Sequence, residues 1–448
     1  MNRVFALFDH ARRPLFWKSL SEMNSSRLSY REIVPDRLKA LLLHAVENVP
    51  FYRELVVSKD AIENDPVRAL KEFPIIEKET LMKDQKAFCI DPLPADAYEN
   101  STGGSTGTPL QVIQDKWYSQ NSLAGKYLFY TWAGWMPGAK ILKIWGSPRD
   151  VLQQKENVKG KVSSMLYKIK VLDAFRISTD DAKNYLREYE AYKPDILECY
   201  VDAAYTLALY VKQTGMTVKH KPRGVIVSAG TLYPEFEKII KEVFQAPVIN
   251  RYGSREAGDI ACTCPEGAIH VNPFTHFVEI VDNNGNPIED GTGHVVLTLL
   301  TNYTMPLIRY KIGDMATVKK NNPPCPCGRD WQTLESVDGR SGSVFRKRDG
   351  SVVSPLFFVH FFGVVHNKGF ISKYQAIQED YDHIVLKVRL RQGFDADNME
   401  VKQGMEQLKK DIKHVMGEDV RVEVRFVEDI PPLPSGKYVY AISKVDGN

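Results

Sequence analysis

Residues 224–250 read GVIVSAGTLYPEFEKIIKEVFQAPVIN. Gly224 to Ser228 and Pro247 to Asn250 are short apolar runs typical of buried strands. The amphipathic residues between them, Glu235 to Phe244, are typical of a helix. A strand, a helix and a second strand in this order predict two parallel strands joined by a crossover helix. The stretch therefore indicates an α/β fold.

The same alternation continues on the N-terminal side of this stretch. Ala139 to Trp145 is another strand-like run, and a helical pattern begins after Ser178. Further upstream, residues 1–95 are rich in helix formers with apolar side chains three and four positions apart, as one buried helical face requires. We expect residues 1–340 to form a large, multi-layer α/β body that begins with a mostly helical region.

A separate pattern follows Ser341. Residues 341–448 contain a helix with apolar side chains at spacings of four and three, from Val401 to Val415. Val420 to Phe426 then alternates apolar and charged residues as a half-buried strand does. The C-terminal residues are therefore expected to form a small α+β domain of their own.

The composition excludes several classes of protein. The chain has 448 residues, 43% hydrophobic and 26% charged, which is neither a small disulfide scaffold nor a disordered chain. A net charge of +3 is too small to predict nucleic acid as a partner, so we expect a small molecule. The first twenty residues interrupt their apolar side chains with charged ones, which argues against a signal peptide, and no transmembrane segment is evident. A cytoplasmic location is expected.

A glycine- and hydroxyl-rich segment lies near residue 105. Such a composition lets backbone N–H groups converge on an anion without obstruction by side chains, and phosphate is the natural ligand. It matches neither the Walker loop nor the dinucleotide fingerprint, and a flexible surface turn would look similar. Its residues are Ser101, Thr102, Gly103, Gly104, Ser105, Thr106, Gly107 and Thr108, followed by Pro109.

Four further motifs follow this segment in order. They are Tyr252-Gly-Ser-Arg-Glu256, Arg309-Tyr-Lys-Ile-Gly-Asp314, Gly339-Arg340 and Leu433-Pro-Ser-Gly-Lys437. With these motifs the sequence resembles the adenylate-forming superfamily of acyl- and aryl-coenzyme A ligases. Within it, the chain is most similar to the phenylacetate–coenzyme A ligase branch, which includes the CapK-type capsular polysaccharide biosynthesis proteins. The resemblance implies ATP, Mg²⁺ and coenzyme A as ligands and a mobile C-terminal lid.

The resemblance also implies a role for each motif. Lys437 would stabilise charge on the α-phosphate in the transition state, and Glu256 would bind Mg²⁺. Asp314 would accept hydrogen bonds from the ribose hydroxyls. Taken singly, each of these is also a common surface residue. The glycine-rich segment would hold the β- and γ-phosphates, and Tyr252 would stack on adenine. Ser228, Ala229 and Gly230 would pass along the edge of the base. The other nucleotide contacts that the resemblance implies are Gly253, Arg255 and Arg340, the last near the ribose or phosphates.

Two close pairs of cysteines suggest a structural metal. Cys262 with Cys264 and Cys325 with Cys327 offer four thiols, enough for a tetrahedral Zn²⁺ if the fold brings the pairs together. His270 is an alternative ligand. Unbound reduced cysteines or a redox pair would fit the same spacing.

These observations predict an ATP-dependent ligase that activates a small, aryl or other carboxylic acid as an acyl adenylate and transfers it to coenzyme A. One alternative is transfer to an amine or a sugar hydroxyl in capsular polysaccharide synthesis. A second is a non-catalytic nucleotide- or zinc-binding protein of the same fold, which the presence of Glu256, Asp314 and Lys437 disfavours. The identity of the acid and the oligomeric state stay open.

Overall fold

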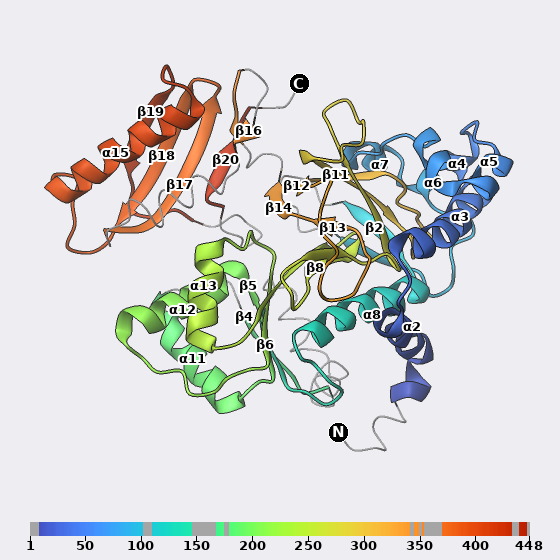
Figure 1. Ribbon diagram of the computed structural model, residues 1–448, viewed down its shortest axis with the longest axis horizontal. Helices are drawn as coiled ribbons and strands as arrows, with labels where there is room; N and C mark the ends of the chain where they lie inside the picture. The colour runs from blue at the N-terminus through green and yellow to red at the C-terminus, as the bar shows by residue number, and fades with distance from the viewer. Residues whose placement is uncertain are drawn as a thin grey trace. The chain divides into compact units, whose positions relative to one another are not determined.

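The structure is a computed structural model (Figure 1). It describes residues 9–101, 110–145, 167–173, 179–340, 345–348, 352–353, 370–431 and 439–445. Contacts divide the chain into two compact units. The first comprises residues 1–229, 239–312 and 316–337, and the second comprises 230–238, 313–315 and 338–448.

The first unit begins with helices, as the sequence predicted. Apolar side chains of these helices pack in one hydrophobic core with strand residues between positions 257 and 334. Leu38, Leu41 and Leu42 therefore have no exposed surface. Pro35 lies inside α3, and Ser29 begins that helix with a capping box to Glu32. The helices are α2 (Pro14–Ser25), α3 (Tyr30–Asn48), α4 (Pro50–Arg53), α5 (Lys59–Asn64), α6 (Pro66–Ala69), η1 (Leu70–Glu72), α7 (Lys78–Lys83) and η2 (Gln85–Phe88).

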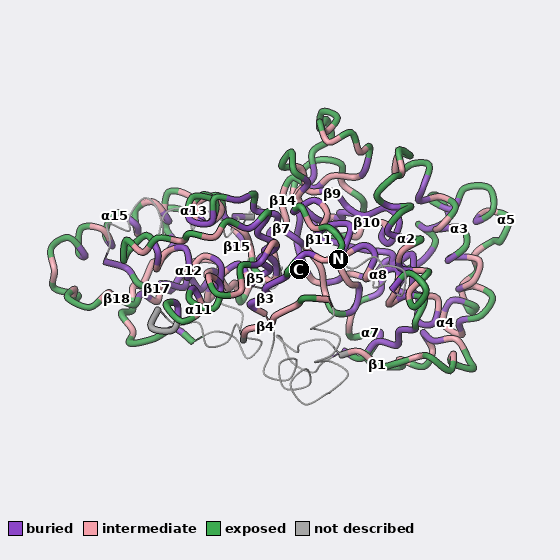
Figure 2. Tube along the Cα trace, turned by 90° about the horizontal axis from the view of Figure 1, so that it is seen from below, coloured by how far each residue is buried: buried purple, intermediate pink, exposed green. Residues whose placement is uncertain are grey.

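An eight-stranded sheet forms the centre of this unit. Its strand order is β13-β9-β8-β7-β6-β5-β3-β4, parallel from β4 to β7 and antiparallel from β7 to β13. β3, β5 and β7 run through buried parts of the chain (Figure 2). The strands are β3 (Ile141–Trp145), β4 (Ile169–Asp173), β5 (Ile196–Tyr200), β6 (Gly224–Ser228), β7 (Val248–Ser254), β8 (Gly258–Thr263), β9 (Ile269–Val271) and β13 (Thr333–Leu334).

Helices connect and cover these strands. α8 (Lys116–Trp132) packs on the sheet face that carries Glu198, because its Tyr130 hydroxyl donates a hydrogen bond to that carboxylate. α11 (Thr179–Tyr192) and α12 (Val201–Thr214) lie together beside β5 and β6 (Figure 1). α13 (Pro234–Phe244) connects β6 to β7 as predicted. The alternation of strands and helices confirms the predicted α/β fold.

Two smaller sheets complete the N-terminal part. The strands β1 (Tyr98–Ser101) and β2 (Gln111–Gln114) pair as an antiparallel hairpin on either side of the glycine-rich segment. A four-stranded sheet has the order β10-β11-β12-β14. Its strands are β10 (His276–Val281), β11 (Gly291–Leu299), β12 (Tyr310–Val318) and β14 (Ser336–Arg340).

The second unit contains the C-terminal α+β module. α15 (Met399–Met416) buries Val401, Met405, Leu408 and Ile412 against a four-stranded sheet of order β19-β18-β17-β20. The antiparallel pair β17 and β18 is flanked by parallel partners. The strands are β17 (Ile371–Asp380), β18 (His383–Leu390), β19 (Arg421–Phe426) and β20 (Ala441–Ser443), with a short pair β15 (Phe345–Arg346) and β16 (Val352–Val353). No helix in the described ranges is long and apolar enough to cross a membrane.

Candidate active site

The predicted magnesium ligand, Glu256, lies in the tight turn between β7 and β8. Only 5% of its surface is exposed. The Ser254 hydroxyl accepts a hydrogen bond from the Ala257 N–H at 3.1 Å, which closes the turn. Gly258 then takes a left-handed backbone conformation with φ of 80°, which glycine adopts without strain. The local sequence therefore holds a carboxylate at the point where the parallel part of the sheet ends.

Side chains of β1 and β2 bind the backbone of this turn. The Asn100 Nδ2 group donates to the Arg255 carbonyl oxygen at 3.1 Å, and Gln114 Nε2 donates to the Glu256 carbonyl oxygen at 3.3 Å. The two amides also bond to each other, because Asn100 Nδ2 donates to Gln114 Oε1 at 3.1 Å. The structure thus places the two strands that flank the predicted phosphate-binding segment against the turn that carries Glu256. Neither amide was identified from the sequence.

A buried histidine supports the same turn from β10. The His276 Nε2 atom lies 2.9 Å from the Ala257 carbonyl oxygen, and the Thr275 hydroxyl lies 2.8 Å from His276 Nδ1. Burial lowers the pKa of His276 to about 4, so the ring is neutral at neutral pH. Nε2–H then donates to Ala257, and Nδ1 accepts from Thr275.

The residues expected beside the nucleotide base lie at the carboxyl ends of neighbouring parallel strands. Ser228 ends β6, and Tyr252 lies near the end of β7. Ala229 follows with a positive φ of 61°, a conformation that non-glycine residues seldom adopt. At Gly253, a Cβ atom would lie 2.4 Å from the Gly258 carbonyl oxygen, so only glycine fits there. Ligands of open α/β sheets bind at this edge.

Asp314 lies on β12 and is 8% exposed. The preceding Gly313 has a φ of 84° within the strand, which makes a local irregularity before the carboxylate. Together with Gly230, Asp314 belongs to the second unit. Arg340 is the last residue of β14. Lys437 and residues 102–109 lie outside the described residues.

Loss of the Asp314 carboxylate is expected to weaken nucleotide binding. We expect Asp314→Ala to raise the Kd for ATP by about 10- to 100-fold, because hydrogen bonds to a charged group contribute about 1.5–3 kcal/mol. Calorimetric titration with ATP measures the change. Asp290→Ala, at an exposed turn position, serves as the control and should bind as the parent does. Parental affinity in Asp314→Ala would contradict the ribose role.

Three of the four predicted cysteine ligands do come together, with His270 as the fourth member. The Cys264 and Cys325 sulfurs lie 3.6 Å apart, and the Cys327 sulfur lies 3.3 Å from His270 Nε2. All four possible ligand atoms are within 4.8 Å of one another. A tetrahedral zinc with Zn–S bonds of about 2.3 Å requires sulfurs about 3.8 Å apart, close to this spacing.

The fold explains how these four residues meet. The chain turns at Cys264, where the Gly267 N–H donates to the Cys264 carbonyl oxygen, and returns as β9. β13 pairs with β9 so that Thr333 lies opposite His270, which brings in the preceding cysteine loop. Cys262 lies within β8 opposite His270, but its sulfur is not among the four ligand atoms that lie within 4.8 Å of one another. The group that the described residues bring together is therefore three of the four predicted cysteines with His270, the alternative ligand.

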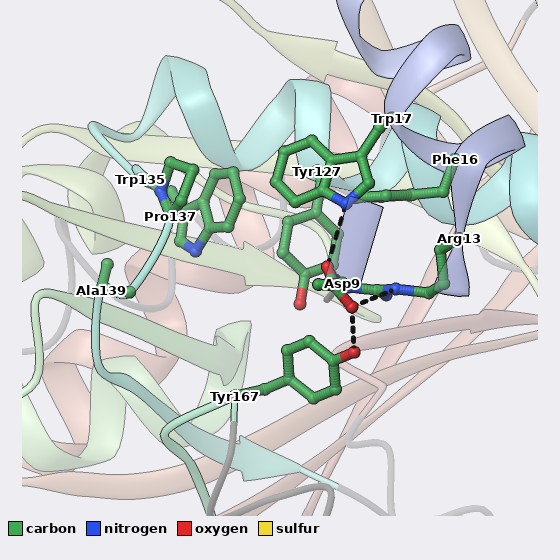
Figure 3. Close-up of a pocket in the computed structure, with 10 residues that line it drawn as sticks. Asp9, Arg13, Phe16, Trp17, Tyr127, Trp135, Pro137, Ala139 and Tyr167 are labelled. Atoms are coloured by element: carbon green, nitrogen blue, oxygen red, sulfur yellow. Dashed lines mark hydrogen bonds and ion pairs between the residues drawn. The ribbon is translucent and has the colours of Figure 1, made fainter. Parts of the chain in front are cut away.

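A small pocket lies at the opposite, amino-terminal end of β3 (Figure 3). The Asp9 carboxylate at its rim accepts hydrogen bonds from Arg13 at 2.6 and 2.9 Å, from Trp17 at 3.0 Å and from Tyr167. Although burial opposes it, these bonds lower the pKa of Asp9. The cavity measures about 30 Å³, room for one or two waters but not for a carboxylic acid. Its other lining residues are Phe16, Tyr127, Trp135, Pro137, Gly138 and Ala139, none of them a predicted site residue.

Comparisons with known proteins agree with the fold and the motifs. The family model of the CapK C-terminal domain matches residues 345–444. Protein CapK from Staphylococcus aureus is 23% identical over 416 residues, which cover 92% of this chain and 89% of CapK. Phenylacetate-coenzyme A ligase from Thermus thermophilus is 24% identical over 332 residues, 70% of this chain and 71% of the ligase.

A solved structure of 2-hydroxyisobutyryl-CoA ligase, in the postadenylation state with 2-HIB-AMP, has the same fold. It superposes with a TM-score of 0.67 at 16% sequence identity, covering 88% of this chain and 85% of that one. The predicted fold of the adenylate-forming type is thereby confirmed. The relatives support the resemblance stated from the motifs and the expectation of an adenylate-forming enzyme.

Proposed function

We propose that this protein is an ATP-dependent ligase that joins a small carboxylic acid to AMP and then passes the acyl group to coenzyme A. The observation that carries the proposal is the contact between the β1–β2 hairpin and the Glu256 turn. The two strands that flank the glycine-rich segment contact the turn that carries Glu256, and the fold is shared with a structure that holds an acyl-AMP.

The proposed chemistry has two steps. In the first, a carboxylate oxygen attacks the α-phosphorus of ATP and pyrophosphate leaves, with the ammonium of Lys437 stabilising the charge that collects on the α-phosphate. In the second, the coenzyme A thiolate attacks the acyl carbon and AMP leaves. The Glu256 carboxylate is a hard oxygen ligand of the kind that Mg²⁺ prefers. Magnesium would neutralise charge on the departing pyrophosphate.

ATP–pyrophosphate exchange over a panel of carboxylic acids tests the first step. We expect exchange with at least one acid and none without acid. Absence of exchange with every acid, in protein that binds ATP, would favour a non-catalytic nucleotide-binding role. Product analysis with coenzyme A as acceptor then tests the second step.

A second acceptor class has support from the comparisons. The C-terminal module matches the CapK C-terminal domain, and CapK itself covers most of the chain. Transfer to an amine or a sugar hydroxyl of a capsular polysaccharide precursor is therefore the alternative second step. Acyl transfer to an amino sugar, with no thioester formed from coenzyme A, would select this alternative.

Replacing the Glu256 carboxylate by an amide tests the magnesium role. We expect Glu256→Gln to raise the Mg²⁺ concentration for half-maximal exchange by about 10-fold, because a neutral amide is a weaker ligand for a hard cation. Glu266→Gln, at an exposed turn position, is the matched control. A magnesium dependence that does not change would remove Glu256 from the metal site.

We also propose a structural zinc held by Cys264, His270, Cys325 and Cys327. Four protein ligands leave no open position for substrate, so the ion would act as a clamp between the β8–β9 turn and the loop before β13. Such an ion contributes to folding free energy, because the unfolded chain has no preformed site.

The ligand set makes a sharp prediction for this zinc. Elemental analysis should find about one zinc per chain in the parent and in Cys262→Ser, but much less in Cys325→Ser and His270→Ala. The latter two should also melt at lower temperature. An equal loss of zinc from Cys262→Ser would instead favour the set of four cysteine ligands. Parent protein that is fully stable without metal would contradict the zinc site and leave four reduced thiols as the explanation.

A further inference from the structure

A cluster of charged side chains lies between α8 and the parallel part of the large sheet. Glu198 on β5 is its centre, with its carboxylate 2.8 Å from Arg251 Nη2, 3.0 Å from Lys143 Nζ and 3.4 Å from Lys126 Nζ. On the far side, Arg251 Nε lies 3.3 Å from an Asp259 carboxylate oxygen. The Tyr130 hydroxyl donates to Glu198 at 2.5 Å. Lys126, Lys143 and Arg251 together form the basic cluster.

The charges of this group do not balance. Among the described residues, the three cations of the basic cluster face two carboxylates, Glu198 and Asp259, which leaves one positive charge without a carboxylate partner. Arg251 Nη1 is buried and has no hydrogen-bond partner in the part of the chain that the structure describes. Burial lowers the pKa of Lys126 to about 8 although Glu198 opposes it, which leaves the lysine charged at neutral pH. An uncompensated buried cation and an unused donor are costly unless an anion binds there.

The strand register places this cluster two residues before the carboxyl ends of β3 and β5, where ligands of α/β sheets bind. Lys143 pairs with Glu198 across β3 and β5, so the next residues on that face are Trp145 and Tyr200. Tyr200 in turn pairs with Ser228, at the end of β6. The Trp145 ring lies 5.3 Å from Arg251 Cζ, and its centroid is 4.5 Å from that of Tyr200. The link to the residues proposed to meet the nucleotide therefore runs through Tyr200 and Ser228, because Arg251 and Tyr252 are successive residues of β7 and point to opposite faces of the sheet.

The ammonium groups are also accessible. Glu198 and Arg251 keep only 1% and 2% of their side-chain surface exposed, whereas Lys126 and Lys143 keep 25% and 19%. A ligand can therefore reach the cluster from the side of the two lysines. Hydrocarbon placed against them would instead strip water from their charges without compensation.

We propose that the acid activated here carries a second anionic group, which the basic cluster binds while the reacting carboxylate meets ATP. This inference rests on the proposed function, because it names the substrate class of the same reaction. It refines the expectation of an aryl acid. The proposed substrate class is therefore a dianion, with the reactive carboxylate at one end of the molecule and a second carboxylate at the other.

Pairs of acids with and without the second carboxylate test the proposal. The pairs are glutarate with monomethyl glutarate, and 2-carboxyphenylacetate with phenylacetate, each measured by ATP–pyrophosphate exchange. We expect the diacid of a pair to have the higher kcat/KM. Lys143→Met, which leaves two cations facing two carboxylates and so should fold, is expected to lower kcat/KM for the diacid by about 10- to 100-fold, the effect of one charged hydrogen bond. The monoacid should change by less than about threefold.

Lys319→Met, which removes a surface lysine paired with Glu335, is the control and should leave both members unchanged. A higher rate with the monoacid, or a diacid preference that survives in Lys143→Met, would overturn the proposal. If no acid supports exchange, the proposed function fails, and calorimetry with the same acids decides the charge question separately. Diacid binding that Lys143→Met weakens would support the anion site, and absence of diacid binding would overturn it.

Discussion

Lys437→Ala is expected to slow ATP–pyrophosphate exchange by about 10²- to 10³-fold while leaving the Kd for ATP within a few-fold of the parent. Preorganised groups that meet charge developing only in a transition state typically have effects of this size. The ammonium of Lys437 is proposed to meet the α-phosphate as its charge rises. Ground-state binding should therefore change much less than the rate.

Exchange kinetics and ATP calorimetry on the same preparations separate these two effects. Lys444→Ala is the matched control, because Lys444 lies seven residues further along and its ammonium pairs with Glu379 at 2.5 Å. It should exchange pyrophosphate at the parental rate. An equal loss in both variants, or a Lys437→Ala protein that exchanges normally, would remove Lys437 from the chemistry.

Glu198→Gln is expected to have the largest effect on stability, lowering the free energy of unfolding by about 3–5 kcal/mol. Removing one partner of a buried ion pair leaves the other charges without compensation. Here the amide would leave the basic cluster facing only Asp259. Urea unfolding measures the change, and Glu188→Gln, which affects an exposed pair with Lys170, should shift the transition by less than about 1 kcal/mol.

The same carboxylate predicts a pH dependence of stability. Burial alone would raise the pKa of Glu198, but the attraction of the three cations and the hydrogen bond from Tyr130 hold it well below its ordinary value. A carboxyl with a lower pKa in the folded state stabilises the fold above its unfolded pKa of about 4.3. That contribution is lost as the pH falls through the folded pKa. Glu198→Gln should therefore lose less stability on acidification than the parent, and an identical acid profile would contradict the pairing.

The sequence predicted the sheet and its connections because local patterns specify them. Gly224 to Ser228 and the helix after it are legible from apolar spacing alone, and the structure places β6 and α13 there. Local patterns of this kind do not predict the basic cluster. Lys126, Glu198 and Arg251 lie far apart in the chain, and only the order and register of the strands and the packing of α8 on the sheet bring them together. Lys143 is a charged residue within a strand-like run and belongs to no motif.

The proposed zinc ligands were also only partly predictable from the sequence. Two cysteines at positions 262 and 264 suggested a pair, yet the strand ends between them, and His270 enters from the neighbouring strand instead. Asn100 and Gln114 were missed for another reason. Their amides bond to backbone carbonyl groups, which every residue type has. The sequence of the turn therefore gives no sign of the contact.

That amide contact has a consequence for ionic strength. Asn100 and Gln114 hold the Glu256 turn through uncharged donors and acceptors, and Gln114 is 1% exposed. Dissolved ions screen attraction between charges, but they act little on hydrogen bonds between neutral groups. The backbone beside Glu256 should therefore keep its place in concentrated salt. A fall in activity with rising salt would then report weaker attraction of charged ligands, with the protein scaffold unchanged.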